Sequence, residues 1–139
     1  MSDNLTAGYS GTPLVKKLGI KADNRIAFVH APDHYMASLG ALPVGVVICE
    51  LAQGNLDFVH AFYDEREQLV AEFAQLAASI AKHGMIWVSW PKKASNVATD
   101  ITGNDVREIG LEVGLVDVKV AAVDDVWSGL KFMYRKRDR

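Results

Sequence analysis

Two adjacent lysines in a polar segment near the middle of the chain are the residues best suited to hold a ligand. The segment SWPKKASNVATDIT contains Lys92 and Lys93, with Ser95 and Asn96 close behind them. The helix that we expect next has a partly positive first turn with free N–H groups, which favours an anion beside the lysines. Hydroxyl and amide side chains also serve as ordinary caps and turns, and Asp100 would repel an anion. The segment therefore predicts either an anion-binding loop or a solvated connection.

The histidines and the single cysteine form the second group of residues with useful chemistry. His30 and His34 are four positions apart, and Cys49 and His60 follow in two later apolar runs. A metal site would need ligands at a spacing such as HExxH or CxxC, and neither pattern occurs. A neighbouring histidine could activate Cys49 as a nucleophile, although a cysteine within VGVVICE is typical of a small core residue. We therefore expect no metal, and we interpret the histidines as hydrogen-bonded residues at strand ends.

A nucleotide or adenosylmethionine cofactor usually needs a glycine-rich turn after the first strand, where the backbone approaches the ligand closely. The segment at that place is HAPDHY, in which Pro32 lacks a backbone donor. Neither GxGxxG nor GxxxxGK[ST] occurs in the sequence. The sequence therefore argues against ordinary dinucleotide binding, and we predict no cofactor.

Periodicity and capping residues indicate the elements that position these side chains. Six apolar runs are typical of strands, at residues 25–31, 44–50, 56–64, 85–90, 116–123 and 130–136. Four segments begin at a capping residue and end at a glycine, which predicts helices within 12–19, 33–40, 64–84 and 102–114. The last two strands are joined by the short segment DDVWSG, so we expect them to form an antiparallel hairpin.

The alternation of strands and helices predicts an α/β fold, a three-layer Rossmann-like sandwich with a mainly parallel sheet and a C-terminal antiparallel hairpin. The methyltransferase variant of this fold ends in the same way, which is an analogy of architecture alone. We expect a single domain over 1–139, with an N-terminal arm at 1–22 and a basic C-terminal end at 131–139. Ligands bind beyond the carboxyl ends of the strands in such sheets. This rule predicts one site, lined by residues 30–35, 49–50, 60–64 and 89–93.

Composition and charge narrow the classes of function. Half of the residues are hydrophobic and 23% are charged, which is typical of a globular domain. We expect a cytoplasmic protein without membrane contact, because no apolar run reaches the roughly 18 residues of a span, residues 1–11 do not resemble a signal peptide, and one cysteine cannot form an internal disulfide. Five basic residues lie in the last nine positions, which leaves a charge of −6 on the rest of the chain. We interpret this end as a solvated terminus and rank nucleic-acid binding last.

Three blocks of the sequence, taken together, resemble one bacterial family. The blocks GYSGTPLVKKLGIK, IWVSWPKKASNVATDIT and GLVDVKVAAVDDVWSGLKF are similar to domain-of-unknown-function family 3052, in the same order and over nearly the whole chain. The sequence departs from the expected pattern at Asn96–Ala98, where a glycine and a proline would stand. The family has no established activity, so the resemblance implies an identity and carries no catalytic residues to this chain.

Two hypotheses from different classes remain, and we place them in this order. The first is a non-enzymatic binding or interaction protein that self-associates, because no catalytic constellation is complete; Trp127, in the hairpin connection, is its candidate interface residue. The second is a small enzyme or sensor that binds an anionic, phosphate-bearing small molecule or an adenosylmethionine-like ligand at the carboxyl edge of the sheet. Its candidate ligand-binding residues are Lys92, Lys93, Ser95, Asn96, His30, Asp33 and His34. The sequence leaves open whether the chain is an enzyme.

Overall fold

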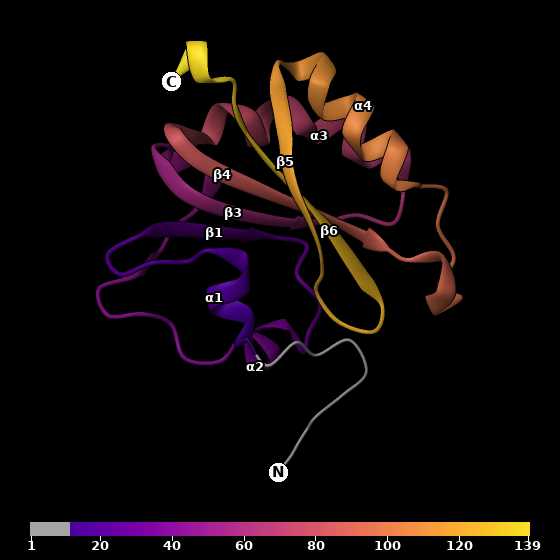
Figure 1. The fold of residues 1–139 in the computed structure, drawn as a ribbon, viewed down its shortest axis with the longest axis horizontal. Coiled ribbons are helices and arrows are strands. Elements are labelled where there is room, and N and C mark those ends of the chain that lie inside the picture. Colours follow the sequence, from indigo (N-terminus) through magenta and orange to yellow (C-terminus); the bar gives the residue numbers. More distant parts are fainter. Residues whose placement is uncertain (1–11) are drawn as a thin grey trace.

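The computed structural model describes residues 12–139, so our expectations for residues 1–11 lie outside the described part of the chain. Six strands form one sheet: β1 (Arg25–Val29), β2 (Val47–Ile48), β3 (Leu56–Phe62), β4 (Ile80–Pro91), β5 (Leu115–Ala122) and β6 (Trp127–Tyr134). Their order is β2-β1-β3-β4-β6-β5 (Figure 1). β2, β1, β3 and β4 are parallel, whereas β6 runs antiparallel to β4 and β5. The predicted mainly parallel α/β sheet with a C-terminal antiparallel hairpin is confirmed.

Helices cover both faces of the sheet, which gives the predicted three layers (Figure 1). One face carries α3 (Arg66–Ser79) and α4 (Gly103–Val113), and the other carries α1 (Leu14–Leu18) and α2 (Tyr35–Leu39). Three short 3₁₀ turns, η1 (Leu51–Gln53), η2 (Lys93–Ser95) and η3 (Lys136–Asp138), complete the described chain. None of the helices within residues 12–139 is long and apolar enough to cross a membrane.

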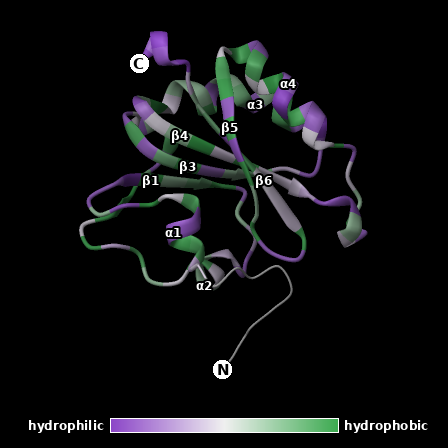
Figure 2. Ribbon diagram, in the orientation of Figure 1, coloured by the Kyte–Doolittle hydropathy of each residue, from purple (hydrophilic) through white to green (hydrophobic). Residues whose placement is uncertain are grey.

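The ends of α1 and α4 follow from local side-chain chemistry. Gly19 and Gly114 adopt left-handed backbone angles, with φ of 93° and 102°, and their amides bond back to helix carbonyls. At the start of α4, the Thr102 hydroxyl accepts a hydrogen bond from the Asp105 amide while the Asp105 carboxylate accepts one from the Thr102 amide. This is the capping box that the sequence predicts. Figure 2 shows hydrophobic and hydrophilic residues alternating along this helix.

Two predicted helix starts are wrong in detail. Thr12 does not cap α1, because Pro13 occupies the position before its first helical residue. Asp33 does not cap α2 either, since His34 stands at that position and makes no side-chain cap bond. Both helices have only five residues and lack a side-chain cap, so packing against the sheet is needed to hold them.

The boundary between α3 and β4 also differs from the prediction. We expected the helix to continue to Gly84, but it ends at Ser79, and β4 begins at Ile80 with Leu56 of β3 as its partner. A Cβ added at Gly84 would lie 2.5 Å from the Leu56 carbonyl oxygen, so the glycine permits close strand contact instead of ending a helix.

The second strand is shorter than predicted because it lies at the edge of the sheet. Only Val47 and Ile48 pair with β1, although the apolar run extends from 44 to 50. Val44, Val47 and Ile48 are 82%, 52% and 55% exposed. The run therefore pairs with one strand only and its side chains are largely exposed to solvent. Its hydrophobicity does not correspond to a long buried strand.

The core divides into two clusters, one on each face of the sheet. On the α3/α4 face, Phe73 and Phe132 meet edge to face with ring centroids 5.3 Å apart. Gly110 lets α4 rest directly on the Phe132 ring, since a Cβ there would overlap it. On the opposite face, the Trp87 indole N–H donates to the Leu18 carbonyl at 2.8 Å and fixes the end of α1 on the sheet.

Candidate functional site

The edge at which β1, β3 and β4 end is the place where this fold can build a site, and we call it the carboxyl edge. The chain leaves β1 outward to β2 and then returns to β3 on the other side of β1. The strand order therefore reverses between β1 and β3, and crevices form at such points in open α/β sheets. The segments that follow β1, β2, β3 and β4 all reach this edge, as the sequence predicts.

The turn after β1 is held by side chains from α3. His30 has a φ of 56°, the left-handed region that favours glycine. Its Nε2 lies 3.0 Å from Glu72 Oε1, and its ring packs edge-on against Tyr63 with centroids 5.3 Å apart. The Tyr63 hydroxyl donates to the same Glu72 oxygen at 2.7 Å, and Gln68 Nε2 donates to the other at 3.4 Å. One carboxylate thus collects three side chains at the switch point.

The pKa values of Tyr63 and Glu72 follow from the contacts of these two side chains. Burial raises the pKa of Tyr63 well above its usual range, and the hydrogen bond to Glu72 adds to the effect. Burial also acts to raise the pKa of Glu72, but the hydrogen bonds from Tyr63, His30 and Gln68 outweigh it and lower the pKa overall. Glu72 therefore stays ionised, and Tyr63 stays a neutral donor.

A second histidine–carboxylate pair fastens the hairpin connection to the same edge. His34 Nε2 lies 3.0 Å from Asp124 Oδ2, while Asp124 Oδ1 accepts hydrogen bonds from the amides of Val126 and Trp127, each at 2.8 Å. Burial acts to raise the pKa of Asp124, but the bonds from His34 and the two amides lower it overall. Trp127 is half-buried and packs edge-on against Phe62, at 5.2 Å between centroids. Trp127 therefore packs against the sheet, while its role at an interface stays a prediction.

Below the carboxyl edge, three buried polar side chains form a continuous hydrogen-bonded chain. The Tyr35 hydroxyl lies 2.8 Å from His60 Nδ1, and His60 Nε2 lies 2.7 Å from Ser89 Oγ. All three groups are satisfied if Tyr35 donates to a neutral His60, whose other nitrogen donates to Ser89. Burial lowers the pKa of His60 to about 3, so its ring stays neutral at physiological pH. The chain links α2 to β4 across β3.

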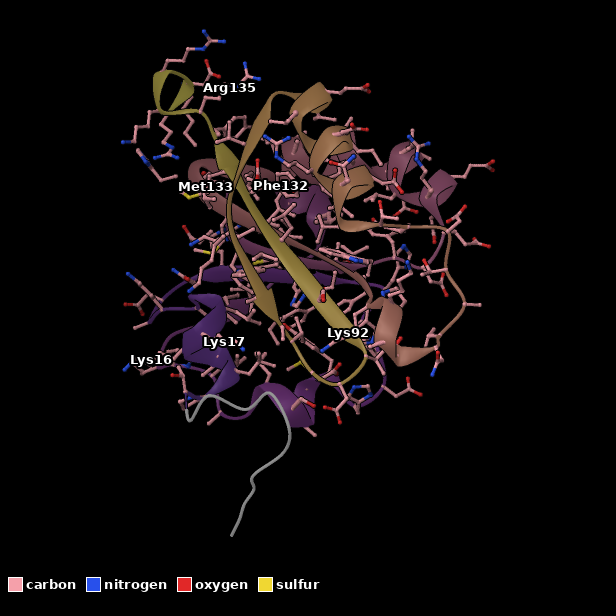
Figure 3. All side chains as sticks on the ribbon, turned by 45° about the vertical axis from the view of Figure 1, so that its right-hand side comes forward. Lys16, Lys17, Lys92, Phe132, Met133 and Arg135 are labelled. Carbon is pink, nitrogen blue, oxygen red and sulfur yellow. The ribbon has the colours of Figure 1, made fainter. Side chains whose placement is uncertain are left out.

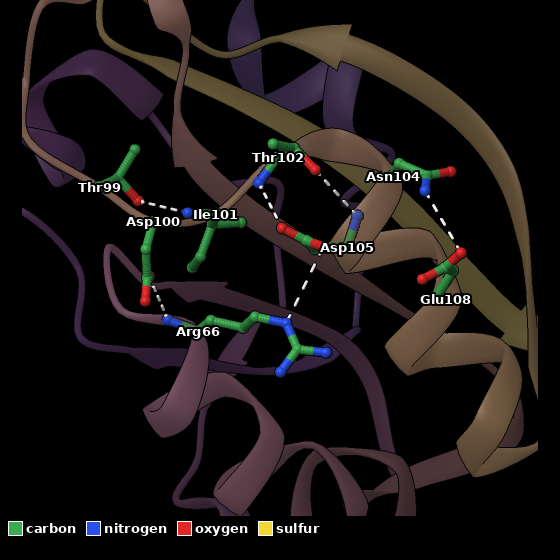
Figure 4. Close-up of polar contacts among 8 residues, drawn as sticks. All are labelled: Arg66, Thr99, Asp100, Ile101, Thr102, Asn104, Asp105 and Glu108. Atoms are coloured by element: carbon green, nitrogen blue, oxygen red, sulfur yellow. Dashed lines mark hydrogen bonds and ion pairs between the residues drawn. The ribbon is translucent and has the colours of Figure 1, made fainter.

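The segment between β4 and α4 is organised by contacts with the start of α3 (Figure 4). Asp100 Oδ1 accepts a hydrogen bond from the Arg66 amide at 2.7 Å, and so caps α3 from the neighbouring loop. The Thr99 hydroxyl donates to the Asp64 carbonyl at 2.7 Å. Arg66 also lies 3.9 Å from Asp105, the acidic residue of the α4 capping box. The predicted cap of α3 by Asp64 is therefore wrong, because Asp100 takes that role.

A groove of about 560 Å³ opens between this loop and the end of β4. Its wall contains Trp90, Pro91 and Ile101, and Lys93 stands among the polar lining residues. Gly103 borders the groove, and a Cβ at that position would lie 3.1 Å from the Trp90 ring. The capping box occupies the amides of Thr102 and Asp105, so the predicted anion site at this helix start has fewer free donors.

The structure divides the predicted ligand-binding residues into two groups at the carboxyl edge. His30, Asp33 and His34 stand after β1, while Lys92, Lys93, Ser95 and Asn96 stand after β4. The last two belong to the turn itself. The Ser95 hydroxyl donates to the Lys92 carbonyl at 2.7 Å, and Asn96 ends η2 in a left-handed conformation. The Lys92 amide donates to the Val126 carbonyl at 2.7 Å, which ties the loop to the hairpin.

His60 does not lie on the same face of the sheet as Cys49. Cys49 is buried in the cluster on the α3/α4 face, whereas His60 packs with α2 on the opposite face. The sheet separates them, so His60 cannot activate this thiol. Within residues 12–139, no group of three or more histidine, cysteine or acidic residues is arranged to hold a metal ion.

The fold resembles those of known methyltransferases. Magnesium protoporphyrin IX methyltransferase from Synechocystis PCC 6803, solved with bound SAH, has a TM-score of 0.57 at 14% identity, covering 88% of this chain and 78% of that one. Precorrin-6y C5,15-methyltransferase from Geobacter metallireducens GS-15 has a TM-score of 0.56 at 10% identity, covering 88% and 86%. Aeropyrum pernix fibrillarin, solved with natively bound S-adenosyl-L-methionine, has 0.54 at 11%, covering 91% and 70%. These likenesses show the fold alone.

Neither a protein-family model nor a curated protein matches this sequence. The resemblance to domain-of-unknown-function family 3052 therefore stays a prediction.

The sequence predicts a site at the carboxyl edge, but it does not indicate two of the residues that organise this edge. Gln68 and Glu72 belong to the first turns of α3, whereas the residues predicted to line the site lie at the ends of strands. Their spacing of four residues on a helix was the available signal, because side chains at that spacing share one face. Glu50, by contrast, lies at a strand end that the sequence predicts to line the site.

Proposed function

We propose that this chain binds an S-adenosylmethionine-like ligand at the carboxyl edge, above β1 and β3, as a small enzyme or as a ligand sensor. The observation that carries the proposal is the switch point itself, where a left-handed turn at His30 is followed twenty residues later by an exposed carboxylate, Glu50, at the end of β2. In dinucleotide-binding α/β folds an acid about 20 residues beyond the first turn holds the ribose hydroxyls. Glu50 would have this role here.

The residues at the turn fit such a ligand better than they fit a phosphate. His30 reaches the left-handed geometry that a glycine would otherwise provide, and the bond to Glu72 holds it there. Exposed acidic residues follow β1, β2 and β3 at this edge; they are Asp33, Glu50, Asp64 and Glu65. S-adenosylmethionine carries a sulfonium and an ammonium group against one carboxylate, so its net charge is positive. A negative rim attracts this ligand and repels a dinucleotide.

The strand order also indicates where the two lysines of the loop after β4 would stand relative to the ligand. Lys92 and Lys93 stand beyond β4, which is separated from β1 by β3. A ligand bound above β1 and β3 would therefore have these lysines at its side. The glycine-rich turn is missing, so fewer backbone amides face the ligand, and the exposed carboxylates must provide more of the affinity. When bound, this ligand would supply an activated methyl group.

The fold comparisons support this proposal over the first hypothesis of a purely non-enzymatic interaction protein. Proteins with the same arrangement of strands hold SAM or SAH in their solved structures. Self-association is a separate property, and a binding site at the carboxyl edge is compatible with it.

Calorimetry with S-adenosylmethionine, S-adenosylhomocysteine and adenosine tests the proposal on the full chain. We expect S-adenosylmethionine to bind and to raise the melting temperature in proportion to its saturation. S-adenosylhomocysteine, which lacks the sulfonium charge, should bind more weakly at low ionic strength. Glu50→Gln should weaken S-adenosylmethionine about tenfold, the value of one charge-assisted hydrogen bond.

Glu112→Gln is the matched control, because Glu112 is an exposed acid near the opposite end of α4. This variant should bind as the parent does. The proposal is overturned if S-adenosylmethionine gives no heat and no thermal shift at millimolar concentration, or if Glu50→Gln and Glu112→Gln have the same affinity.

A further inference from the structure

Three lysines from distant parts of the sequence converge on one face of the sheet, and we call them the lysine cluster: Lys21, Lys119 and Lys131. Lys119 of β5 and Lys131 of β6 are directly opposed in the antiparallel register. Lys131 is in turn opposed to Trp87 of β4. Opposed residues of an antiparallel pair project to the same face, so the two lysines and the tryptophan form one row across three strands.

The row lies on the face that α1 covers. The Trp87 indole bonds to the carbonyl of Leu18, the last residue of α1, and Lys21 follows three residues later. Lys119 and Lys21 are both close enough to Lys131 to act on its charge. The three ammonium groups therefore come from the segment after α1, from β5 and from β6, and Lys131 stands half-buried between the two exposed ones.

The charges of the lysine cluster lack counterions in the described chain. Arg66 and Arg107 pair with Asp105 and Asp117, but no ion pair within residues 12–139 includes any of the three lysines. Burial lowers the pKa of Lys131, and the positive charges of Lys119 and Lys21 lower it further. Like charges held together oppose folding, so this arrangement is unfavourable unless an anion neutralises it.

We propose that Lys21, Lys119 and Lys131 form a binding site for a multiply charged phosphate group. Lysine ammonium groups act as point charges towards phosphate oxygens, and three of them match the charge of a di- or triphosphate. Lys131 is half-buried and Lys21 and Lys119 are exposed, so all three are open to a ligand from solvent. Figure 3 shows Lys16, Lys17 and Arg135 on the left side of the molecule, away from Lys92.

This site is separate from the carboxyl edge and does not depend on the proposed S-adenosylmethionine-like ligand. It shares only Lys131 with the basic C-terminal end at 131–139, because Lys21 and Lys119 lie outside that segment. The partner chemistry is the phosphate group, which a small molecule or a nucleic acid could each carry. The experiment distinguishes these two sources.

Isothermal titration with tripolyphosphate at low ionic strength tests the proposal on the full chain. We expect binding that Lys131→Gln and Lys119→Gln each weaken about tenfold or more, as loss of one charge-assisted contact predicts. Lys82→Gln is the matched control, since Lys82 is an exposed lysine that does not act on the charge of Lys131. It should bind tripolyphosphate as the parent does. Lys119 is exposed, so its variant tests binding even if the Lys131 variant loses stability.

A second titration uses a single-stranded RNA oligonucleotide over a range of salt concentrations. If the phosphate belongs to a nucleic acid, RNA binds more tightly than tripolyphosphate, and replacing one lysine reduces the slope of log affinity against log salt by about 0.7. If it belongs to a small molecule, tripolyphosphate binds more tightly. The proposal is overturned if neither probe binds, or if both cluster variants bind with the affinity of the Lys82→Gln control.

Discussion

The carboxyl edge and the lysine cluster differ in whether their charged groups have partners within the protein. At the carboxyl edge, Glu72 and Asp124 each collect several hydrogen bonds from side chains or amides of the same protein. In the lysine cluster, three like charges converge and no acidic residue of the described chain pairs with them. The first region is satisfied by its own contacts, whereas a bound phosphate group would balance the second in our proposal.

This difference indicates how each region responds to change. Removing a carboxylate from the carboxyl edge leaves buried donors without an acceptor, so the folded state loses stability. Removing an ammonium group from the lysine cluster relieves repulsion, so the folded state gains stability while binding is lost. A cluster of like charges that serves binding is expected to show this exchange of stability against affinity.

The largest effect should come from acid, through the buried chain beneath the carboxyl edge. His60 stays neutral in the folded protein because burial lowers its pKa to about 3, whereas the unfolded chain takes up a proton near the ordinary histidine value of 6.5. Below that value only the unfolded state binds the proton. Stability is therefore complete above pH 6.5 and falls as the pH decreases, by about 1.4 kcal/mol per pH unit.

Urea denaturation at several pH values between about 4.5 and 6.5 measures this slope, because the carboxylates with lowered pKa values titrate below that window. In His60→Asn the contribution of this residue to the slope should vanish, even though the variant starts from a lower stability. An unchanged slope in His60→Asn would contradict the assignment.

The next effect should come from the carboxylate at the switch point. Glu72→Ala leaves the buried Tyr63 hydroxyl without its acceptor and removes the partner of His30. We expect the free energy of unfolding to decrease by about 1–3 kcal/mol. Gln75→Ala, at an exposed position of the same helix, should change it by less than about 0.5 kcal/mol. Equal effects of the two substitutions in chemical denaturation would mean that Glu72 does not organise this edge.

The smallest effect has the opposite sign and comes from the lysine cluster. Lys131→Met keeps an apolar stem of similar length and removes the charge between Lys119 and Lys21. We expect the free energy of unfolding to increase by about 0.5 kcal/mol at low salt. The gain should shrink at high salt, because salt screens the repulsion among the lysines of the parent protein. Chemical denaturation at two salt concentrations measures it. A loss of stability at low salt would show that the charges of the cluster are already neutralised within the protein.

Local chemistry explains why some elements could be predicted from the sequence. The capping box of Thr102 and Asp105 and the left-handed Gly114 lie within a few residues of the helix ends that they define. The short DDVWSG connection allows only an antiparallel pairing of its neighbours. The alternation of such elements was enough to predict the sheet, its three layers and the edge that carries the candidate site.

The features that the sequence missed depend on contacts between distant residues. Asp100 caps a helix 34 residues before it, and Glu72 meets His30 across 42 residues. No local pattern contains these pairs. The lysine cluster joins Lys21 to residues about a hundred positions later; strand register pairs Lys119 with Lys131, and the packing of α1 on the sheet adds Lys21. Sequence patterns specify the elements, whereas the register between elements specifies which charges meet.

The position of β6 has a consequence for how the protein is made. This strand is synthesised after every other strand of the sheet, yet it lies between β4 and β5 and bonds to both. Until residues 127–134 leave the ribosome, β5 has no place in the sheet, and the apolar edge of β4 stays open. Chains interrupted before this point therefore expose a strand edge suited to aggregation. The half of the sheet that contains the lysine cluster is thus completed last.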